Sequence, residues 1–416
     1  MKKSILFWFV LLLVCASFVS ASAHDISGEI SVLVRPDEGG VFEKYVPLFE
    51  AETGVKVTVD FVSWDEITAK TLTTLASGGG GYDVVFIPSA DATKLMAGGW
   101  FEPITDMISD DPGAWLEALV KFYSDRDGNL LGIPWYSGAS HFVYNKAILE
   151  AAAVDPESLT SWDAVLEACA KIKEVGAVEY CFTPSAKYPG NFYYNWGSVG
   201  HSFGAKFFDE EGTILFDHEE AVLNATKMYE TGVKEGYFNP AGIAMSDYDA
   251  LIEFGTGATA FMINSTWSAT QATRNPELSS VYENAEIALL PGEFGTYLYG
   301  GAFGVLTASD NKDAAKAFIQ FITSEEAQKD HAIEGGNLPT RVSLFTDADI
   351  SAAWKGYDVL SAQLDHGDFA PKLEWFDAWR QAAATAIQDV LKESKSAEDA
   401  IEWLKAETEK IIAEAE

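Results

Sequence analysis

The alternation of short strand patterns with helix patterns is the feature that most limits how this chain can fold. In residues 55–61, apolar residues alternate with polar ones, which predicts a strand with one polar side. Residues 84–87 form a continuous apolar run, which is typical of a strand buried in a mostly parallel sheet. A helix pattern that begins at Phe42 and stops at Gly54 separates residues 55–61 from an earlier apolar run at 30–34. This order of elements predicts α/β layers.

The same alternation continues along the rest of the chain. Further strands are predicted at residues 130–134, 142–144, 258–263 and 301–307, and helices at 160–172, 314–322 and from 372 to the C-terminus, with a break near 393–395. Thr160 or Ser161 is the expected cap of the helix at 160–172. No internal repeat divides the chain. With 416 residues, of which 48% are hydrophobic, it is long enough to bury a core in more than one lobe.

Residues 1–23 have the pattern of a secretory signal peptide. Two lysines directly after Met1 precede an almost unbroken apolar run at residues 5–14, and Ala21-Ser22-Ala23 supplies the small residues that signal peptidase needs. We therefore expect cleavage before His24 and a mature protein in the periplasm, or otherwise outside the cytoplasm.

Two alternative interpretations of the N-terminus agree less well with the sequence. A membrane anchor would need about 20 apolar residues, and no stretch of the chain approaches that length. A lipid-modified Cys15 would need a small residue before it, whereas Val14 is not small.

The charge balance excludes two classes of partner. Asp and Glu number 63 against 28 Lys and Arg, which gives a formal net charge of −35. Nucleic acids and anionic membrane surfaces would repel such a protein, so we expect neither as a partner. The aromatic content of 13% is high enough for a packed core, so the acidity does not imply disorder.

The cysteines and histidines give no sign of a metal site. Two cysteines, Cys169 and Cys181, remain after removal of the signal peptide, and a disulfide or two buried free thiols are equally compatible with them. A structural zinc ion would need four ligands, and the six histidines are scattered. We therefore expect no metal and no cofactor.

Catalytic motifs are also missing from the sequence. There is no G-x-S-x-G, HExxH or GxxxxGK[ST] pattern, and the glycine run at residues 78–81 lacks the lysine and hydroxyl of a phosphate-binding loop. With 63 acidic residues, a chance pair of carboxylates carries little weight as a glycosidase signature. The sequence predicts a binding protein and not an enzyme.

Several tryptophans lie where strands end or helices begin. Trp64 follows a predicted strand, Trp267 follows Asn264, and Trp375 and Trp379 are four residues apart on one helix face. Sugar rings stack their C–H faces on such side chains, and ligands bind at strand ends in α/β sheets. On their positions alone, a role in a pocket and a role in the core are equally compatible with these residues.

The ordered segments of the chain resemble one family of transport proteins. The matching segments are residues 42–57, 81–86, 97–104, 132–135, 144–146, 162–163, 254–267, 300–304, 311–318 and 336–341. Together they are similar to the extracellular solute-binding proteins of ABC importers, specifically the maltose-binding-protein-like family 1 group. The resemblance spans essentially the whole mature chain.

The resemblance implies a fold and a set of partners. The fold would be a type II-like periplasmic-binding-protein fold, with two mixed sheets flanked by helices, a hinge and a central cleft. The N-lobe would comprise residues 24–137 plus 267–332, and the C-lobe residues 138–266 plus 333–416. Ligand contacts to both lobes would drive hinge closure. A monomer that delivers its solute to ABC permease subunits is implied.

The resemblance also implies which residues line the cleft. The expected ligand-binding residues are Arg35, Asp37, Glu38, Trp64, Ser89, Asp91, Tyr136, Ser137, Tyr193, Trp196, Asn264, Trp267, Gly301, Arg341 and Trp375. Two alternatives stay open, because the register does not separate Tyr193 from Tyr194, or Trp375 from Trp379. Position 138 is glycine where some relatives carry a polar contact residue.

These residues lead to one functional hypothesis and two alternatives. Tryptophans mixed with Asp, Asn and Arg favour capture of a sugar or sugar-derived solute. The same scaffold could instead bind a polyamine, a metal-ion complex or a phosphorylated polyol. An extracellular carbohydrate-active enzyme would require two carboxylates at a set separation across the scissile bond.

Overall fold

The computed structural model describes residues 26–36, 39–78, 80–187, 189–209, 213–216 and 220–415. The predicted signal peptide lies outside these residues and stays a prediction. Within the described residues, none of the helices is both long enough and apolar enough to cross a membrane.

Three parallel strands form one end of the sheet. β1 (Glu29–Val34) lies between β2 (Lys56–Phe61) and β3 (Val84–Pro88) and is parallel to both. All residues of β3 are buried, whereas β2 is an edge strand with exposed and half-buried residues. The difference confirms the two strand patterns, because β3 is covered on both faces and β2 is not.

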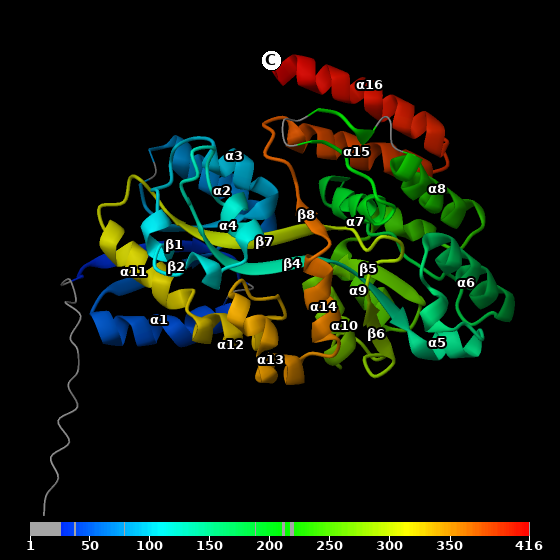
Figure 1. The fold of residues 1–416 in the computed structure, drawn as a ribbon, viewed down its shortest axis with the longest axis horizontal. Coiled ribbons are helices and arrows are strands. Elements are labelled where there is room, and N and C mark those ends of the chain that lie inside the picture. Colours follow the sequence, from blue (N-terminus) through cyan, green and yellow to red (C-terminus); the bar gives the residue numbers. More distant parts are fainter. Residues whose placement is uncertain are drawn as a thin grey trace, which may run out of the picture.

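Two long strands connect the halves of the molecule (Figure 1). β7 (Thr296–Val305) is antiparallel to β3 and to β4 (Ile133–Asn145). Beyond Ala139, β4 leaves β7 and pairs instead with β5 (Phe261–Ser265) and β6 (Ala285–Ala288). The sheets of the two halves therefore share β4, and the strand order is β2-β1-β3-β7-β4-β5, with β6 on β4 and β8 (Gly367–Phe369) on β7. The strand predicted at 142–144 and the last two residues of the one predicted at 130–134 belong to this one strand, whereas residues 130–132 precede it.

Helices cover both halves of the sheet (Figure 1). The half that contains β1–β3 carries α1 (Gly39–Thr53), α2 (Trp64–Ala76), α3 (Ala92–Met96), α4 (Glu117–Phe122), α11 (Lys312–Ile322) and α12 (Glu325–Gly335). The other half carries α5 (Lys146–Ala151), α6 (Trp162–Val175), α7 (Pro189–Ser202), α8 (Glu220–Lys234), α9 (Asp247–Gly255), α10 (Thr266–Arg274), α13 (Ala348–Ala353), α14 (Tyr357–Leu364), α15 (Phe376–Leu391) and α16 (Ala397–Ala415). The gap between α15 and α16 confirms the predicted break near 393–395.

The buried apolar side chains form three clusters. The first joins residues 30–136 to 302–327, and the second joins residues 142–263 to 290–411. The third cluster contains Ala269, Ala272 and Ala285, which the sequence assigned to the N-lobe, together with side chains between residues 332 and 360. The lobe boundaries themselves stay a prediction.

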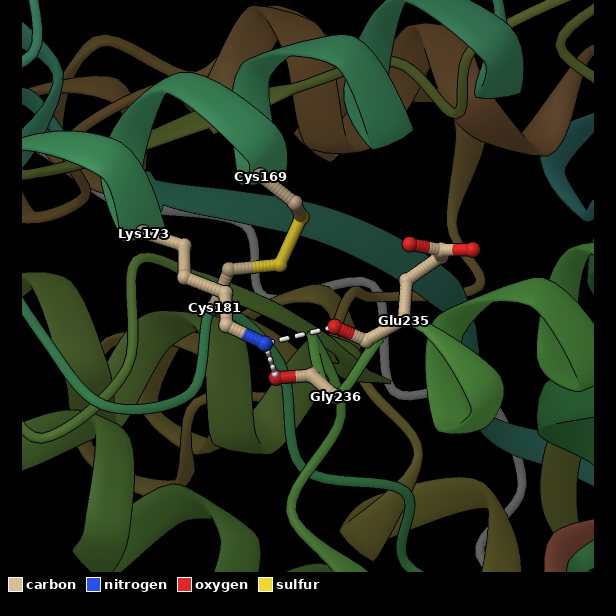
Figure 2. Close-up of a disulfide and its surroundings, with 5 residues drawn as sticks. All are labelled: Cys169, Lys173, Cys181, Glu235 and Gly236. Carbon is tan, nitrogen blue, oxygen red and sulfur yellow. Dashed lines mark hydrogen bonds between the residues drawn. A yellow bond between two sulfur atoms is a disulfide. The ribbon is translucent and has the colours of Figure 1, made fainter.

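A disulfide ties α6 to the segment that precedes α7 (Figure 2). Ser161 caps α6 by accepting the N–H of Ala164 at 3.2 Å, which selects Ser161 over Thr160. Cys169 on this helix is bonded to Cys181, with Cα atoms 5.5 Å apart. One turn further on, Lys173 Nζ donates to the carbonyl of Glu235, just beyond α8, at 2.6 Å. The disulfide resolves the alternative that the sequence left open.

Candidate functional site

A buried arginine lies on two stacked rings at the carboxyl end of β1. Arg35 directly follows β1 and is 2% exposed. Its guanidinium carbon lies 4.7 Å from the ring centroid of Phe86 on β3 and 5.2 Å from that of Tyr136 on β4. The two rings have centroids 6.1 Å apart and planes 14° from parallel. Cation–π contact of this kind holds the guanidinium in place, so the sheet brings the predicted residues Arg35 and Tyr136 together.

Ser89 and Gly301 lie beside this stack. Gly301 is paired with Pro88 in the β3–β7 ladder, and the N–H of the preceding Gly300 donates to Ser89 Oγ at 3.0 Å. A Cβ atom at position 301 would lie 2.4 Å from ring atoms of Phe86 and 2.8 Å from the ring of Tyr136. No side chain fits at position 301 unless these rings move, which explains why a glycine lies beside the predicted site residues.

Charged and phenolic groups from the two halves face one another near the crossing strands. Asp91 ends the short 3-10 helix η2 (Ser89–Asp91), and its Oδ2 accepts the hydroxyl of Thr68 at 2.7 Å. From the other half, Tyr194 on α7 lies with its ring 5.9 Å from the guanidinium carbon of Arg380 on α15. Burial raises the pKa of Tyr194, Arg380 opposes that shift, and the negative charge of Asp91 adds to it. Asp91 also acts to raise the pKa of Arg380, so the charge of this carboxylate influences both groups.

Tyr123 carries a buried hydroxyl near the carboxyl end of β3, where it donates to the carbonyl of Ile87 at 3.3 Å. Burial raises the pKa of Tyr123; Tyr136 and Tyr194 add to the shift, and Arg35 opposes it. The charges of Arg35, Tyr136 and Tyr194 therefore all act on this one buried hydroxyl.

An aromatic pair lies at the start of α10. The rings of Trp267 on α10 and Tyr248 on α9 are 27° from parallel with centroids 6.5 Å apart. Tyr248 is 49% exposed and Trp267 is half-buried, so both retain accessible ring surface. Burial raises the pKa of Tyr299 on β7, whereas Thr266 and the backbone N–H of Trp267 lower it. The ring of Tyr299 is 6.4 Å from that of Tyr136, and Thr266 Oγ1, one residue before Trp267, accepts the N–H of Ala139 on β4 at 3.0 Å. The aromatic pair therefore begins beside the crossing strands.

Two predicted site residues use their polar atoms inside the protein. Ser137 is 2% exposed, and its Oγ donates to the carbonyl of Pro339 at 2.8 Å. Asn264 is 1% exposed; its Nδ2 donates to the carbonyl of Asp247 at 2.9 Å and its Oδ1 accepts the N–H of Ser265 at 2.8 Å. Both side chains support the backbone at the crossing strands, and neither presents a free polar atom to a solute.

The aromatic helix α7 presents a different residue from the ones predicted. Tyr193 and Trp196 are 0% exposed in the second apolar cluster, and Trp196 Nε1 donates to Thr226 Oγ1 at 3.1 Å. Tyr194, in contrast, is half-buried and faces Arg380 and Asp91. The structure thus places the rings of Tyr193 and Trp196 in the core and Tyr194 on another face of α7, because successive helix residues point about 100° apart. A role of Tyr193 and Trp196 in binding stays a prediction.

Burial at the start of α15 distinguishes Trp375 from Trp379, two residues that the sequence alone could not tell apart. Trp379 is 0% exposed and packs among the rings of Phe208, Phe216 and Phe376. Trp375 is half-buried at the N-cap position, with its ring 5.3 Å from that of Phe208. Of the two, only Trp375 keeps accessible surface.

Arg341 lies apart from the residues described so far. Its guanidinium carbon is 3.7 Å from the ring centroid of Trp115, and Nε and Nη2 donate to the carbonyl of Thr323 at 3.3 and 3.2 Å. It lines a separate cavity of about 150 Å³, together with Asp110 and Asp111. The structure therefore does not bring Arg341 together with the Arg35 stack.

Three predicted residues are not placed. Asp37 and Glu38 lie outside the described residues, and so does the side chain of Trp64, whose backbone begins α2. Their roles stay predictions.

Sequence reasoning missed Arg380 and Tyr248 and left Tyr194 unresolved. Tyr248 lies between Ser246 and Asp249, which form the capping box at the start of α9, and this helix start is readable from the sequence. Arg380 gives no such signal, because only the packing of α15 against α7 brings it to Tyr194.

A buried histidine at the crossing strands makes the stability depend on pH. His141 on β4 is 0% exposed, its Nε2 lies 2.8 Å from Thr266 Oγ1, and burial lowers its pKa from 6.5 to about 3. Below about pH 6.5, His141 binds a proton in the unfolded chain but stays neutral in the folded protein. The free energy of unfolding therefore falls as the pH is lowered towards 3, by up to about 1.4 kcal/mol per pH unit.

Urea unfolding at a series of pH values between neutral and about pH 4 measures this slope. A His141→Asn variant is expected to have a shallower slope than the unaltered protein, since it lacks the titrating ring. Equal slopes would contradict the role of His141.

The arrangement has the chemistry of a binding site. It combines accessible aromatic faces with guanidinium, carboxylate and phenol groups, which suits a polar solute with apolar ring faces. Among the described residues, no group of three or more His, Cys, Asp or Glu side chains is placed to hold a metal ion.

Known proteins match this chain over most of its length. A mannitol-binding protein of Pseudomonas aeruginosa is 27% identical over 301 residues, 70% of this chain and 68% of its own. A Sinorhizobium fredii protein named as a probable amino-acid ABC transporter periplasmic-binding protein is 26% identical over 75% of this chain and 73% of its own. The structure of maltose-bound MalE3 of T. maritima superposes with a TM-score of 0.82 at 21% identity, covering 92% of this chain and 100% of that one.

The superposition confirms the predicted fold class, a two-lobed α/β binding-protein fold. The sequence profile of bacterial extracellular solute-binding proteins matches residues 35–329. That match includes the crossing strands β4 and β7 together with Arg35, Asp91, Tyr194 and Trp267. On this match and this fold, the chain belongs to the family of bacterial extracellular solute-binding proteins.

Proposed function

We propose that this chain is the extracytoplasmic receptor of an ABC importer and that it captures a sugar or sugar alcohol between its lobes. The observation that carries the proposal is the near-parallel pair of Tyr248 and Trp267, whose accessible rings lie next to the crossing strands. A sugar ring or an extended polyol can cover such a face while its hydroxyls bond to neighbouring polar groups. The names of the mannitol-binding and maltose-bound relatives support the same class of solute.

Closure of the lobes would follow from contacts made to both at once. Asp91 comes from the half that contains β1–β3, and Tyr194 and Arg380 come from the other half. A solute that bonds to both sides stabilises the closed form over the open one, and β4 and β7 are the segments that would bend. The proposed lobes are residues 24–137 plus 267–332 and residues 138–266 plus 333–416.

The same proposal includes location and partners. The expected signal peptide at residues 1–23 and the Cys169–Cys181 disulfide both support a mature protein outside the cytoplasm, where disulfides persist. We further propose a monomer that transfers its solute to membrane permease subunits without chemical change.

A panel of candidate solutes tests the function. The mature protein is titrated with maltose, D-mannitol, glycerol 3-phosphate, spermidine and a set of amino acids, and tryptophan fluorescence and thermal shift are recorded. Saturable responses to maltose or D-mannitol are expected. Responses confined to amino acids, spermidine or the phosphate would refute the sugar assignment, and release of product from a polysaccharide would indicate an enzyme instead.

A Trp267→Ala variant should bind the responding sugar about tenfold more weakly or worse, because the largest face of the aromatic pair is lost. Trp267→Phe should recover part of the affinity. The matched control is Trp403→Ala on α16, which removes a half-buried tryptophan that packs on Lys395. If the Trp267→Ala and Trp403→Ala proteins bind the sugar with equal affinity, Trp267 does not contribute to the site.

A further inference from the structure

A small polar cluster joins four segments of the half that contains α7, α9 and β5. Asp247 is the first residue of α9, and its Oδ1 accepts Ser185 Oγ at 2.5 Å and Asn195 Nδ2 at 3.3 Å. Asn195, on α7, also donates to Ser185 Oγ at 2.5 Å. The backbone carbonyl of Asp247 accepts Asn264 Nδ2 from the end of β5 at 2.9 Å. One residue therefore holds the segment around Ser185, α7 and β5 against the start of α9.

Three of the four segments, those of Asn195, Asp247 and Asn264, each carry one aromatic residue of the candidate site. Tyr194 directly precedes Asn195, Tyr248 directly follows Asp247, and Trp267 lies three residues after Asn264. A shift of α9 relative to β5 would separate the rings of Tyr248 and Trp267, and a shift of α7 would move Tyr194 away from Arg380. The hydrogen bonds of Asp247 oppose both movements.

The carboxylate of Asp247 is held mainly by neutral groups. Burial raises the pKa of Asp247, and the donors Ser185 and Asn195 only partly oppose that shift. No ion pair to Asp247 occurs among the described residues; the nearby Lys187 acts on Asp249, which belongs to the capping box of α9. The role of this half-buried carboxylate is therefore to accept hydrogen bonds from Ser185 and Asn195 and not to pair with a cation.

We propose that Asp247 is a positioning residue of the solute site. Its carboxylate holds the start of α9 on Ser185 and Asn195, its backbone carbonyl holds Asn264, and together these hydrogen bonds set the aromatic face formed by Tyr194, Tyr248 and Trp267. It does not touch the solute. The inference rests on the proposed function for its role in binding, but its structural part applies to the protein without any ligand.

The first experiment therefore uses the ligand-free protein. The near-ultraviolet circular dichroism of the unaltered protein minus that of Trp267→Phe isolates the signal of Trp267. Asp247→Ala keeps the backbone carbonyl that accepts Asn264 Nδ2, but it removes the acceptor of Ser185 and Asn195 and so releases the start of α9, which carries Tyr248, from α7. Because Tyr248 then shifts against the ring of Trp267, at least about half of this difference band should be lost. Asp247→Asn should keep the band, because its Oδ1 still accepts both side-chain donors.

The matched control is Asp347→Ala. Like Asp247, Asp347 lies at the start of a helix: it is the N-cap of α13, accepts the N–H groups of Asp349 and Ile350 and pairs with Lys329, but it takes no part in the cluster. It should lower thermal stability and leave the Trp267 band intact. An intact band in Asp247→Ala, or an equal loss in Asp347→Ala, would overturn the proposal.

The second experiment measures affinity with D-mannitol and maltose as probes. For the probe that binds, Asp247→Ala should weaken binding about tenfold, whereas Asp247→Asn should stay within about threefold of the unaltered protein. Equal losses in both variants would mean that the carboxylate itself contacts solute, which would overturn a positioning role. If neither probe binds the unaltered protein, the proposed function fails and the Trp267 band alone decides the inference.

Discussion

Gly301→Ala should lower the free energy of unfolding by about 2 kcal/mol and weaken sugar binding at least about tenfold. The new Cβ would lie 2.4 Å from ring atoms of Phe86 and 2.8 Å from the ring of Tyr136. Both rings are at most 1% exposed, so neither can turn towards solvent. Relief of the overlap must separate the two rings and displace Arg35, which lies on both of them.

Urea unfolding followed by circular dichroism measures the first effect, and fluorescence titration measures the second. Gly80→Ala is the matched control, because a Cβ at that exposed turn would have nothing within 4 Å. Indistinguishable behaviour of the two variants would show that the Phe86–Tyr136 stack tolerates a methyl group and that the site does not depend on it.

Replacement of both cysteines by serine should lower the free energy of unfolding by about 2–3 kcal/mol. The disulfide closes a short loop, since Cys169 and Cys181 are 12 residues apart, and in the chain-entropy account its loss frees the unfolded chain. It also removes the covalent link between α6 and the segment that leads to Ser185 and α7. A smaller loss of solute affinity is therefore expected as well.

A strong reductant should destabilise the unaltered protein by the same amount and leave the double serine variant unchanged. Both cysteines are at most 3% exposed, so reduction is expected only where the protein opens locally. A protein that loses no stability on reduction would contradict the stabilising role of the bridge.

Much of the fold was predictable because its signals are local. The alternation in residues 55–61 predicted a strand with one polar side and the apolar run at 84–87 predicted a buried strand, and β2 and β3 form there, β2 partly exposed and β3 fully buried. The break between α15 and α16 was readable in the same way. Local patterns did not show that residues 133–145 form one strand, because its middle, around Gly138, has no strand periodicity and is extended by its partners on β7.

The site was only partly predictable, because register and packing decide which atoms face a solute. Tyr193 and Tyr194 are chemically alike, so no sequence pattern says which one α7 buries. Asn264 lies at the expected strand end, yet its amide is used by Asp247 and Ser265. Arg341 is part of a matching segment, but it stacks on Trp115 beside a different cavity.

By itself, the sequence determined that this protein is an α/β molecule with the ordered segments of a solute-binding family, and it predicted an N-terminus suited to export. These properties depend on periodicity, composition and short segments, all of which can be read from the local sequence. Only the tertiary structure decided that Cys169 and Cys181 are bonded, that Tyr194 rather than Tyr193 meets Arg380 and Asp91, and that Tyr248 stands beside Trp267. Those outcomes depend on contacts between segments far apart in the chain, and packing selects among side chains that the sequence leaves equivalent.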